Sequence, residues 1–506
     1  MPIITAAHLY DHVACPHRVQ LDNFGQTDKR DEISPFVKLL WERGSIYEAS
    51  VVSALPYGSY ISLRDLTADK REEATLNAIR DGALLIYGGR IAVDDLLGEP
   101  DLLIKRNGGY LAADIKSGQG EADGDEGSDG KLKPHYAVQV ALYTDILQRL
   151  GFGLGRVAEI WDVKGRHVLY ELDLPRHTKT TETWWDVYTK SVVQVRSILE
   201  GTSHTKGALS SACKLCHWYS FCREELTAAG DLTLIPSLGR AIRDSMSDHL
   251  GSINEFADCN PEGFIVAKKT TIPKLGVDRL RLFHKRAQLL TDPAAKPFLR
   301  EVVTLPSTEL EIFFDIEADP MNDIVYLHGF VERTDRDPAT EKFTAFFADA
   351  NTEKAEQAAF AGAIAWMKER PGAAIYYYSK YERTMYRKLC ERFPDVCSPE
   401  EIEELFRPPR SIDLYFDVVT KATEWPTTDH SIKTLAKYLG FAWRDVDPSG
   451  AASIEWYQRW VETGDQTIRK RILDYNEDDC RATAVLLDGV RELVSLPRGA
   501  VPHEWI

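Results

Sequence analysis

Two aspartates and a lysine around a predicted β-hairpin have the types and spacing of a metal-dependent hydrolytic site. In PDLLIKRNGGYLAADIKS, residues 100–117, two apolar runs flank Asn107-Gly108, a strong signal for a two-residue type I′ turn. This turn predicts the cross-strand pairs Arg106 with Gly109, Ile104 with Leu111, and Asp101 with Asp114. Lys116 lies two residues beyond Asp114, so its side chain shares that face of the hairpin.

Two carboxylates that oppose each other across a β-ladder repel, and a divalent cation between them removes the repulsion. Such a cation, Mg²⁺ or Mn²⁺, lowers the pKa of a bound water and polarises a phosphoryl oxygen. A lysine beside the cation can orient the nucleophile or stabilise developing charge. The alternative is a solvated hairpin that carries three charged residues.

Four cysteines have the spacing of a metal or cluster site. Cys213, Cys216 and Cys222 follow a C-x2-C-x5-C pattern, which lets three thiolates point at one centre, and Cys15 in DHVACPHR supplies a fourth ligand. Such a site would tie the start of a domain to its end. The other four cysteines are scattered, and four disulfides are not expected in a reducing compartment.

A second set of acidic residues lies in the C-terminal part of the chain. The apolar stretch ELEIFFDIEADP predicts a strand with Asp315 and Glu317 on one face. In RILDYNEDDCRATAVLLDGVREL, Tyr475 and Asp479 are four residues apart and therefore share one helical face. The intervening patterns predict strands at 323–332, 342–349 and 373–379 and helices at 352–372 and 380–393. The alternative is that these acids only cap helices and cover surface.

Two Pro-x-Leu-Gly turns between these regions each precede a helical pattern. They end at Gly239 and Gly276, and the second helix carries a local basic face made by Arg279, Arg281, Lys285 and Arg286. Both units resemble helix-hairpin-helix elements, in which backbone N–H groups at a helix N-terminus suit a DNA phosphate. The alternative is an ordinary helical connector between two domains.

The overall composition narrows the class of protein. The chain has 506 residues, 44% hydrophobic and 27% charged, which is typical of a globular protein of about three domains. A net charge of −17 argues against coating nucleic acid by charge alone, although an acidic metal site beside a local basic groove is compatible with it. The sequence has neither a long apolar run nor a signal-peptide pattern, so we expect a cytoplasmic protein without a membrane partner.

The hairpin motif resembles that of the PD-(D/E)xK nuclease superfamily, and in particular its RecB-like branch. In that branch a Gln-x-x-x-Tyr helix follows the core, and residues 137–151 place Gln139 and Tyr143 one turn apart on one helical face. Members also carry an upstream cysteine and a C-x2-C-x5-C group that hold a 4Fe–4S cluster. The resemblance implies catalytic roles for Asp101, Asp114, Lys116, Gln139 and Tyr143. It also implies a 4Fe–4S cluster, with zinc as the alternative, on Cys15, Cys213, Cys216 and Cys222.

One position departs from the RecB-like pattern. The branch usually has a histidine in a Gly-x-x-x-His-Glu-like setting, and RGSIYE places Tyr47 there. Glu48 follows it and is the candidate to take the metal-ligand role, the alternative being a surface glutamate. Asp94 and Asp95, near the hairpin, are weaker candidates.

The C-terminal pattern resembles the RNase H-like fold and, within it, the DnaQ-like or DEDD 3′–5′ exonucleases. The resemblance implies two cations, about 3.5–4 Å apart, held by acids of which three are Asp315, Glu317 and Asp479. It assigns the middle acidic position to Glu382, where aspartate is usual, with Asp413 as the alternative. It also implies that Tyr475 positions the attacking water. The segment 431–441 resembles a substrate-side helix of the same family.

Taken together, the motifs resemble those of RecB-like nucleases fused to a YprB-like RNase H domain, over nearly the whole chain. The implied architecture is α/β and multidomain. It consists of a restriction-endonuclease-like PD-(D/E)xK domain at 1–228, a helix-hairpin-helix-like connector at 229–304 and an RNase H-like DEDD(y) exonuclease domain at 305–506. No Gly-x4-Gly-Lys-Ser/Thr loop occurs in the sequence, so unwinding would require a separate helicase.

Three functions are compatible with these motifs. The first is a metal-dependent DNA nuclease, an exonuclease on single-stranded DNA or DNA ends that acts in repair, recombination or defence. The second is a 3′–5′ RNA exonuclease whose RecB-like half only binds. The third is a non-catalytic nucleic-acid-binding scaffold in which Tyr47 and Glu382 mark decayed sites.

Overall fold

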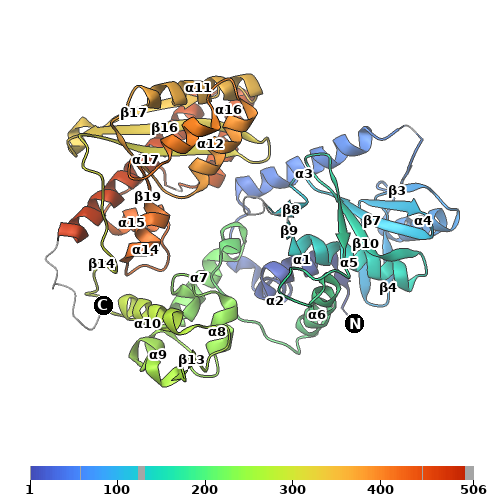
Figure 1. Cartoon of the computed structure of the whole chain (residues 1–506). Coiled ribbons are helices and arrows are strands. Elements are labelled where there is room, and N and C mark those ends of the chain that lie inside the picture. The colour runs from blue at the N-terminus through green and yellow to red at the C-terminus, as the bar shows by residue number, and fades with distance from the viewer. Residues whose placement is uncertain (1, 57, 123–130, 447, 496–506) are drawn as a thin grey trace. The chain divides into compact units, whose positions relative to one another are not determined.

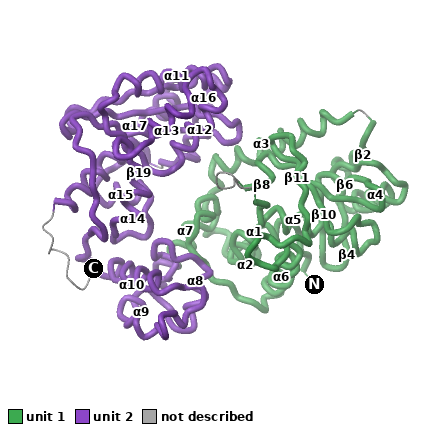
Figure 2. Tube along the Cα trace, viewed as in Figure 1, with its two compact units in different colours: residues 1–225 green, residues 226–506 purple. Residues whose placement is uncertain are grey.

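The computed structural model describes residues 2–56, 58–122, 131–446 and 448–495. The chain divides into two compact units, residues 1–225 and 226–506, which have different colours in Figure 2. The boundary falls inside helix α7 (Tyr219–Ala228). Within the described residues, no helix is long and apolar enough to cross a membrane.

A six-stranded mixed sheet forms the centre of the first unit (Figure 1). Its order is β11-β10-β7-β6-β3-β2. The strands are β2 Ile61–Ser62, β3 Leu85–Tyr87, β6 Leu102–Arg106, β7 Gly109–Ile115, β10 Gly153–Trp161 and β11 His167–Glu171. A smaller sheet contains β1 Ile4–Thr5, β4 Ile91–Val93 and β5 Leu96–Gly98. Apart from the helix that connects β7 to β10, the helices of this part of the unit are α1 Ala6–Ala14, α2 Pro16–Phe24, α3 Pro35–Ser53, α4 Ala68–Arg80 and α6 Trp184–Leu199.

Helix α5 (Pro134–Arg149) connects the parallel strands β7 and β10 and lies at the centre of the unit. It packs against both strands and against α1 and α6. Its buried residues run almost continuously from Ala137 to Leu147. The predicted helix is therefore present, and it is a core helix with little exposed surface.

The predicted hairpin register is confirmed. Strands β6 and β7 pair from Arg106 with Gly109 to Leu102 with Ala113. The predicted type I′ turn is wrong, because Gly108 adopts a positive φ (+100°) and Asn107 does not, whereas a type I′ turn needs both. One glycine in the left-handed region is enough to keep the register.

The second unit begins with short helical elements. They are the 3-10 helix Leu232–Leu234 and the helices α8 Arg240–Met246, α9 Ile253–Asp258 and α10 Val277–Thr291. Gly239 and Gly276 stand directly before α8 and α10, as the sequence predicts. However, a three-residue 3-10 helix precedes Gly239, and the short hairpin β12 (Ile265–Val266) and β13 (Lys269–Thr270) precedes Gly276. Neither glycine therefore joins two α-helices.

The predicted basic face of α10 is partly used for internal contacts. Arg281 pairs with Glu262 at 2.7 Å, and Arg286 is buried and pairs with Glu424 at 2.8 Å. These two guanidinium groups already satisfy carboxylates of the same unit, so α10 offers less positive charge to a phosphate than the sequence suggests.

A five-stranded sheet of order β17-β16-β15-β18-β19 forms the core of residues 310–495. The strands are β15 Leu310–Asp319, β16 Ile324–Thr334, β17 Lys342–Phe347, β18 Ala374–Tyr377 and β19 Ser411–Asp413. The helices are α11 Glu353–Lys368, α12 Tyr381–Arg392, α13 Pro399–Leu405, α15 Ile432–Tyr438, α16 Gly450–Thr463 and α17 Gln466–Ser495. This sequence of elements confirms the predicted β-β-β-α-β-α order.

The two faces of β15 pack against different helices, because successive side chains of a strand point to opposite faces. Ile312, Phe314 and Ile316 pack with residues of α11 and α12. Phe313, on the other face, packs with residues of α17. Asp315 and Glu317 have the same parity as Phe313, so the strand directs both acids toward α17.

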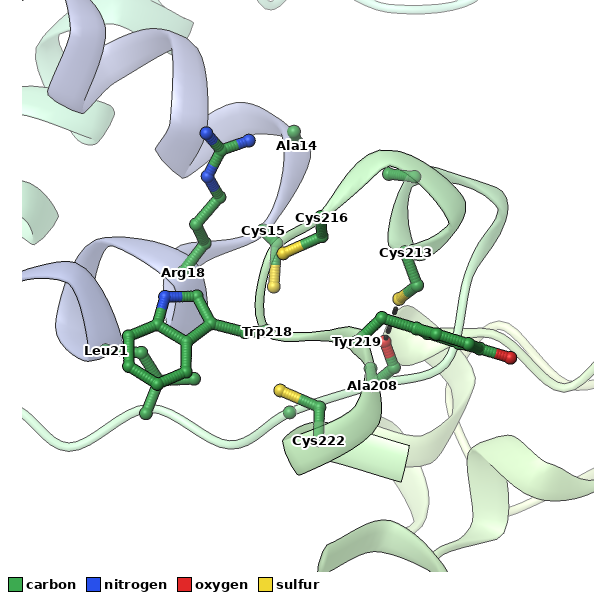
Figure 3. Close-up of a pocket in the computed structure, with 12 residues that line it drawn as sticks. Ala14, Cys15, Arg18, Leu21, Ala208, Cys213, Cys216, Trp218, Tyr219 and Cys222 are labelled. Carbon is green, nitrogen blue, oxygen red and sulfur yellow. Dashed lines mark hydrogen bonds between the residues drawn. The ribbon is translucent and has the colours of Figure 1, made fainter. Parts of the chain in front are cut away.

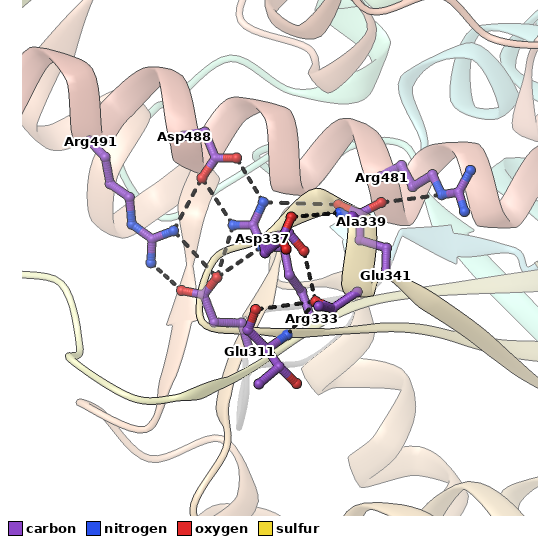
Figure 4. A network of polar contacts seen from close by, with 10 residues as sticks. Glu311, Arg333, Asp337, Ala339, Glu341, Arg481, Asp488 and Arg491 are labelled. Atoms are coloured by element: carbon purple, nitrogen blue, oxygen red, sulfur yellow. Dashed lines mark hydrogen bonds and ion pairs between the residues drawn. The ribbon is translucent and has the colours of Figure 1, made fainter.

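Buried ion pairs also join β15, β16 and α17 (Figure 4). Arg333 of β16, which is 1% exposed, donates to Glu311 of β15 at 2.8 Å and to Asp488 of α17 at 2.7 Å. Arg491 of α17 also pairs with Glu311. Because breaking such a network would leave buried charges unpaired, it fixes the position of α17 along the sheet.

Candidate active sites and the cysteine cluster

Asp101, Asp114 and Lys116 are brought together at the end of the hairpin in the first unit. The backbone N–H of Asp101 donates to Asp114 Oδ1 at 3.3 Å, and the N–H of Ile115 donates to Asp101 Oδ2 at 2.8 Å. Lys116 Nζ lies 2.9 Å from Asp114 Oδ2. The hairpin alone therefore assembles the predicted trio.

Burial sets the charge of this trio. Burial, together with the charge of Asp114, raises the pKa of Asp101 to about 8. Burial acts to lower the pKa of Lys116, but the charges of Asp114 and Asp101 outweigh it and raise that pKa. The lysine is thus held as an ammonium, and Asp101 keeps its proton to a higher pH than an exposed aspartate does.

Glu48 lies near the trio but is held by other partners. Its charge contributes to the raised pKa of Asp101. The hydroxyl of Tyr87 donates to Glu48 at 2.9 Å, and Arg64 lies 3.4 Å from it. Tyr47, at the position of the usual histidine, donates its hydroxyl to the backbone carbonyl of Asp162 at 2.5 Å. Tyr47 therefore anchors α3 and cannot replace a histidine ligand.

Gln139 and Tyr143 lie side by side on α5, where the sequence places them. Gln139 Nε2 donates to the Tyr143 hydroxyl at 3.3 Å. Burial and the charge of Asp114 raise the pKa of Tyr143, which places this tyrosine near the acids. Asp94 and Asp95 instead pair with Arg149 and Arg196, at 3.1 and 2.6 Å, so the structure gives them structural partners.

Sequence reasoning missed an aromatic cluster beside Lys116. The rings of Tyr10 and His135 lie 4.7 Å apart, and those of His135 and Tyr136 lie 4.5 Å apart. Lys116 and Lys133 lie 5.7 and 5.3 Å from the Tyr136 ring. The cluster joins α1 to the first turn of α5 next to the trio, and Tyr10 is 36% exposed.

The second unit contains a tight carboxylate cluster. One oxygen from each of Asp315, Glu317 and Asp479 lies within 4.8 Å of the others, and this is the only such group of three possible ligands in the described parts of the chain. Strand β15 supplies two of the acids and α17 supplies the third. The oxygens of Glu48, Asp101 and Asp114 do not come this close together.

The environment of this cluster fits a cation. Burial and the charges of Asp479 and Glu317 raise the pKa of Asp315 well above its usual value, and burial with Asp479 raises that of Glu317 to about 8. Burial also raises the pKa of Asp479. Glu317 and Asp479 are buried and Asp315 is half-buried, and three such carboxylates with raised pKa values are a suitable donor set for Mg²⁺ or Mn²⁺, which prefer carboxylate oxygens.

Neighbouring groups orient the acids, and the sequence did not reveal them. Asn476 Nδ2 donates to Asp315 Oδ2 at 2.7 Å, and Trp443 Nε1 donates to Asp479 Oδ1 at 2.7 Å. Gly329 opposes Asp315 in the β15–β16 ladder. A Cβ at this glycine would lie 1.6 Å from Asn476 Oδ1, so only glycine leaves room for the amide.

Tyr475 and Glu382 lie at the margin of the cluster. Tyr475 is 4% exposed and hydrogen-bonds to Asp479. Glu382 is buried and its pKa is raised to about 8 by burial, and its charge in turn contributes to the raised pKa of Asp315. Asp413 instead accepts the backbone N–H groups of Tyr415 and Phe416, at 2.9 and 3.1 Å. Its carboxylate thus caps a helical turn, which makes Glu382 the better candidate.

The four predicted cysteines line one pocket of the first unit (Figure 3). Cys15 stands between α1 and α2, whereas the other three come from residues 213–222. Asp22 of α2 holds the second segment, because it accepts Trp218 Nε1 at 2.9 Å and lies 2.6 Å from His217 Nε2. Burial and the charges of the other three cysteines raise the pKa of Cys222 to about 12.

The spacing of the sulfurs bears on the choice between zinc and iron–sulfur. Sulfurs about 2.3 Å from one zinc ion lie roughly 3.8 Å from one another in a tetrahedron. In the described structure, no three of the four sulfurs lie within 4.8 Å of one another. The described positions of the thiols are therefore not those of a closed tetrahedral zinc site.

Comparison with known protein families gives two matches, one in each compact unit. Residues 28–223 match the model of the PD-(D/E)XK nuclease superfamily, and residues 312–490 match that of the RNase H superfamily. Together with the α/β structure, these matches confirm the predicted fusion and fold class. A search of curated proteins found no match.

Proposed function

We propose that this chain, which joins a domain of the PD-(D/E)XK nuclease superfamily to a domain of the RNase H superfamily, is a metal-dependent nuclease with two phosphodiesterase sites. Its proposed substrate is DNA that is single-stranded or has accessible ends, in repair, recombination or defence, with any unwinding supplied by a separate helicase. The observation that carries the proposal is the buried cluster of Asp315, Glu317 and Asp479, since acids held this closely ionise together only beside cations.

In the C-terminal site, Asp315, Glu317 and Asp479 would hold Mg²⁺ or Mn²⁺, with Glu382 close by. The bound metal would supply an activated water and stabilise charge on the phosphodiester. The hydroxyl of Tyr475, already beside Asp479, would orient that water. The neighbouring donors described above keep the acids in place before substrate arrives.

In the N-terminal site, Asp101, Asp114 and Glu48 would hold the metal. The Lys116 ammonium lies against Asp114 and can stabilise charge that develops on a phosphate. Gln139 and Tyr143 border the acids from α5 and would position the strand.

We also propose that Cys15, Cys213, Cys216 and Cys222 hold a 4Fe–4S cluster with a structural role. The four thiols line one pocket and do not form a closed tetrahedral group, which supports this choice. Protein purified without oxygen should show a broad absorption band in the visible blue and about four irons per chain. One zinc per chain without that band would establish the alternative.

The nuclease proposal is tested with the full chain and Mn²⁺. The substrates are 5′-labelled single-stranded DNA, the matching duplex and RNA of the same sequence. Lys116→Ala and Asp315→Asn are each expected to lower one of the two activities about a thousandfold, and the double variant is expected to lower both. Lys164→Ala and Asp349→Asn, at exposed positions, are the matched controls. Degradation of DNA by the double variant at the native rate would reject the proposal.

The same experiment tests a second function, a 3′–5′ RNA exonuclease whose N-terminal half only binds. This function is favoured by the contacts of Glu48, which is held by Tyr87 and Arg64. Glu48, Asp101 and Asp114 therefore do not form a compact group of three acids. In that case Asp315→Asn abolishes cleavage of RNA, and Lys116→Ala changes only binding. Tight binding that needs no metal, without any cleavage, would instead indicate a scaffold.

A further inference from the structure

A lysine of the segment 431–441, to which the sequence assigned no catalytic residue, lies beside the C-terminal carboxylate cluster. Lys433, on α15, donates through Nζ to the Tyr475 hydroxyl at 3.0 Å and to the Pro448 carbonyl at 2.5 Å. The same ammonium lies 4.8 Å from the centre of the Tyr475 ring. These contacts hold the side chain in one place, so its charge is fixed beside the cluster.

The charge of Lys433 acts on all three acids. It lowers the pKa of Asp315, of Glu317 and of Asp479, against the stronger effect of burial. An ammonium is always a donor, so the oxygen of Tyr475 must accept the bond from Lys433. The proton of the tyrosine hydroxyl is then free to point to Asp479, with which Tyr475 is hydrogen-bonded.

We infer that Lys433 has two roles in the C-terminal site. It positions the Tyr475 hydroxyl, and it is a resident counter-charge that competes with divalent cations for the cluster of Asp315, Glu317 and Asp479. This inference rests on the proposed function for the identity of the metal and the reaction, but its effect on metal binding can be measured without a substrate.

Loss of the Lys433 ammonium is expected to change metal affinity and turnover in opposite directions. Loss of the ammonium also raises the pKa of the acids, so the comparison is made at pH 8.5, where ionised acids are more populated. With no fixed positive charge to repel it, a divalent cation then binds the ionised acids more strongly, by about tenfold for a single charge near a partly buried site. Turnover falls about tenfold, because the tyrosine hydroxyl loses the donor that fixes it. A substitution that merely damaged the site would weaken both metal binding and turnover.

The experiment titrates Mn²⁺ alone, by calorimetry, into full chains that carry Asp101→Asn and Asp114→Asn to silence the other site. Lys433→Met is expected to bind Mn²⁺ about tenfold more tightly. Its melting temperature is measured to show that the C-terminal unit of the variant is folded. Lys433→Arg keeps the charge and should bind as the parent does. Lys437→Met, one turn further along α15 and exposed, is the matched control and should change nothing.

Unchanged or weaker Mn²⁺ binding by folded Lys433→Met would overturn the inference. So would an equal gain for Lys437→Met, because the effect would then be one of general charge. If the parent chain cleaves no nucleic acid, the proposed function fails, and the Mn²⁺ titration still decides whether Lys433 competes for the cluster.

Discussion

The two carboxylate sites place their lysines differently. In the N-terminal site, Lys116 lies on the same strand segment as its acid and pairs with Asp114 directly, at 2.9 Å. In the C-terminal site, Lys433 reaches Tyr475, and its charge acts on the acids from beside them. The first site therefore carries a positive charge in direct contact with one of its acids, whereas in the second the ammonium contacts the neighbouring tyrosine.

The sites also differ in what assembles them. One hairpin holds Asp101 and Asp114, so the first site depends on local pairing and on the helices that cover it. The second depends on α17 meeting β15, elements far apart in the sequence. The ion network of Glu311, Arg333 and Asp488 secures that meeting. Local damage should therefore affect the first site, and damage to the β15–α17 interface the second.

Among substitutions outside the proposed catalytic residues, the largest effect is expected for Gly329→Ala. The new methyl group would overlap the Asn476 amide, which would release Asp315 or displace α17. We expect the C-terminal activity to fall about a hundredfold, as displacements near 1 Å at reacting groups do. Asp315-dependent cleavage is measured in a Lys116→Ala background.

Gly372→Ala is the matched control for this substitution, because a Cβ at Gly372 meets no atom within 4 Å. Lys116-dependent cleavage, measured in an Asp315→Asn background, should be unchanged by either glycine substitution. A Gly329→Ala chain that retained full C-terminal activity would show that Asn476 does not position Asp315.

A smaller effect, on the N-terminal site instead of the C-terminal one, is expected for Cys15→Ala. Loss of this ligand would free the junction of α1 and α2, and α1 packs against α5 beside the Asp101, Asp114 and Lys116 trio. N-terminal activity should fall about tenfold, together with loss of the iron of the proposed cluster. Cys259→Ala, outside the pocket, is the control. Equal loss of both activities by a chain whose C-terminal unit remains folded would contradict the independence of the two sites.

The features that the sequence predicted correctly are set by residues that lie close together in the sequence. The register of β6 and β7 follows from their short turn, and the placement of Asp315 with Glu317 follows from the alternation of a strand. The i, i+4 spacing likewise predicted the shared face of Tyr475 and Asp479. Even the wrong turn type left the register correct, because the length of the loop decides it.

The groups that the sequence did not predict depend on tertiary packing. Lys433, Trp443 and Asn476 meet the acids only because α15, the segment before α16, and α17 converge on β15. Nothing in the local pattern of Lys433 or Trp443 marks either residue as part of a site. Asn476 differs, because it follows Tyr475 directly in YNEDD and its place in that motif is a signal for it. The partners of Arg281 and Arg286 were hidden in the same way, so the basic face of α10 was overestimated.

Metal removal should reveal the difference between the sites through pH. In the metal-free chain, burial and nearby acids raise the pKa of Asp101 and of Glu317 to about 8. The folded state then holds these protons more tightly than the unfolded state, so stability falls as pH rises from about 4, the usual carboxyl range, to about 8. Mn²⁺ should restore it, because the ionised acids then face a cation.

The larger C-terminal cluster should account for more of this pH dependence. In a chelator, Glu317→Gln is expected to raise the melting temperature at pH 8 by about 3 °C relative to the native chain, and Asp101→Asn by less. The measurement is thermal unfolding from pH 5 to 8.5 with and without Mn²⁺. A melting temperature that rose with pH in the metal-free native chain would contradict the assigned direction.

The smallest effect is expected for Tyr10→Ala, which tests whether the N-terminal site contacts bases. The rings of Tyr10, His135 and Tyr136 stand beside Lys116, and burial with the charges of Lys133 and Lys116 lowers the pKa of His135 to about 4, so that ring is neutral at pH 7. Neutral aromatic rings next to lysines suit an unpaired base and its phosphate. Loss of the exposed Tyr10 ring should raise KM for single-stranded DNA about fivefold in an Asp315→Asn background, near the low end of stacking energies.

Tyr10→Phe is the matched variant, because it keeps the ring and removes only the hydroxyl. It should leave KM unchanged, and Tyr10→Ala should leave KM for blunt duplex DNA unchanged, since paired bases are not available for stacking. If Tyr10→Phe were as impaired as Tyr10→Ala, the hydroxyl rather than the ring would be the contact. If KM rose equally for duplex and single-stranded DNA, Tyr10 would act through the packing of α1 on α5. The first site would then depend more on its covering helices than on direct contact of Tyr10 with the DNA.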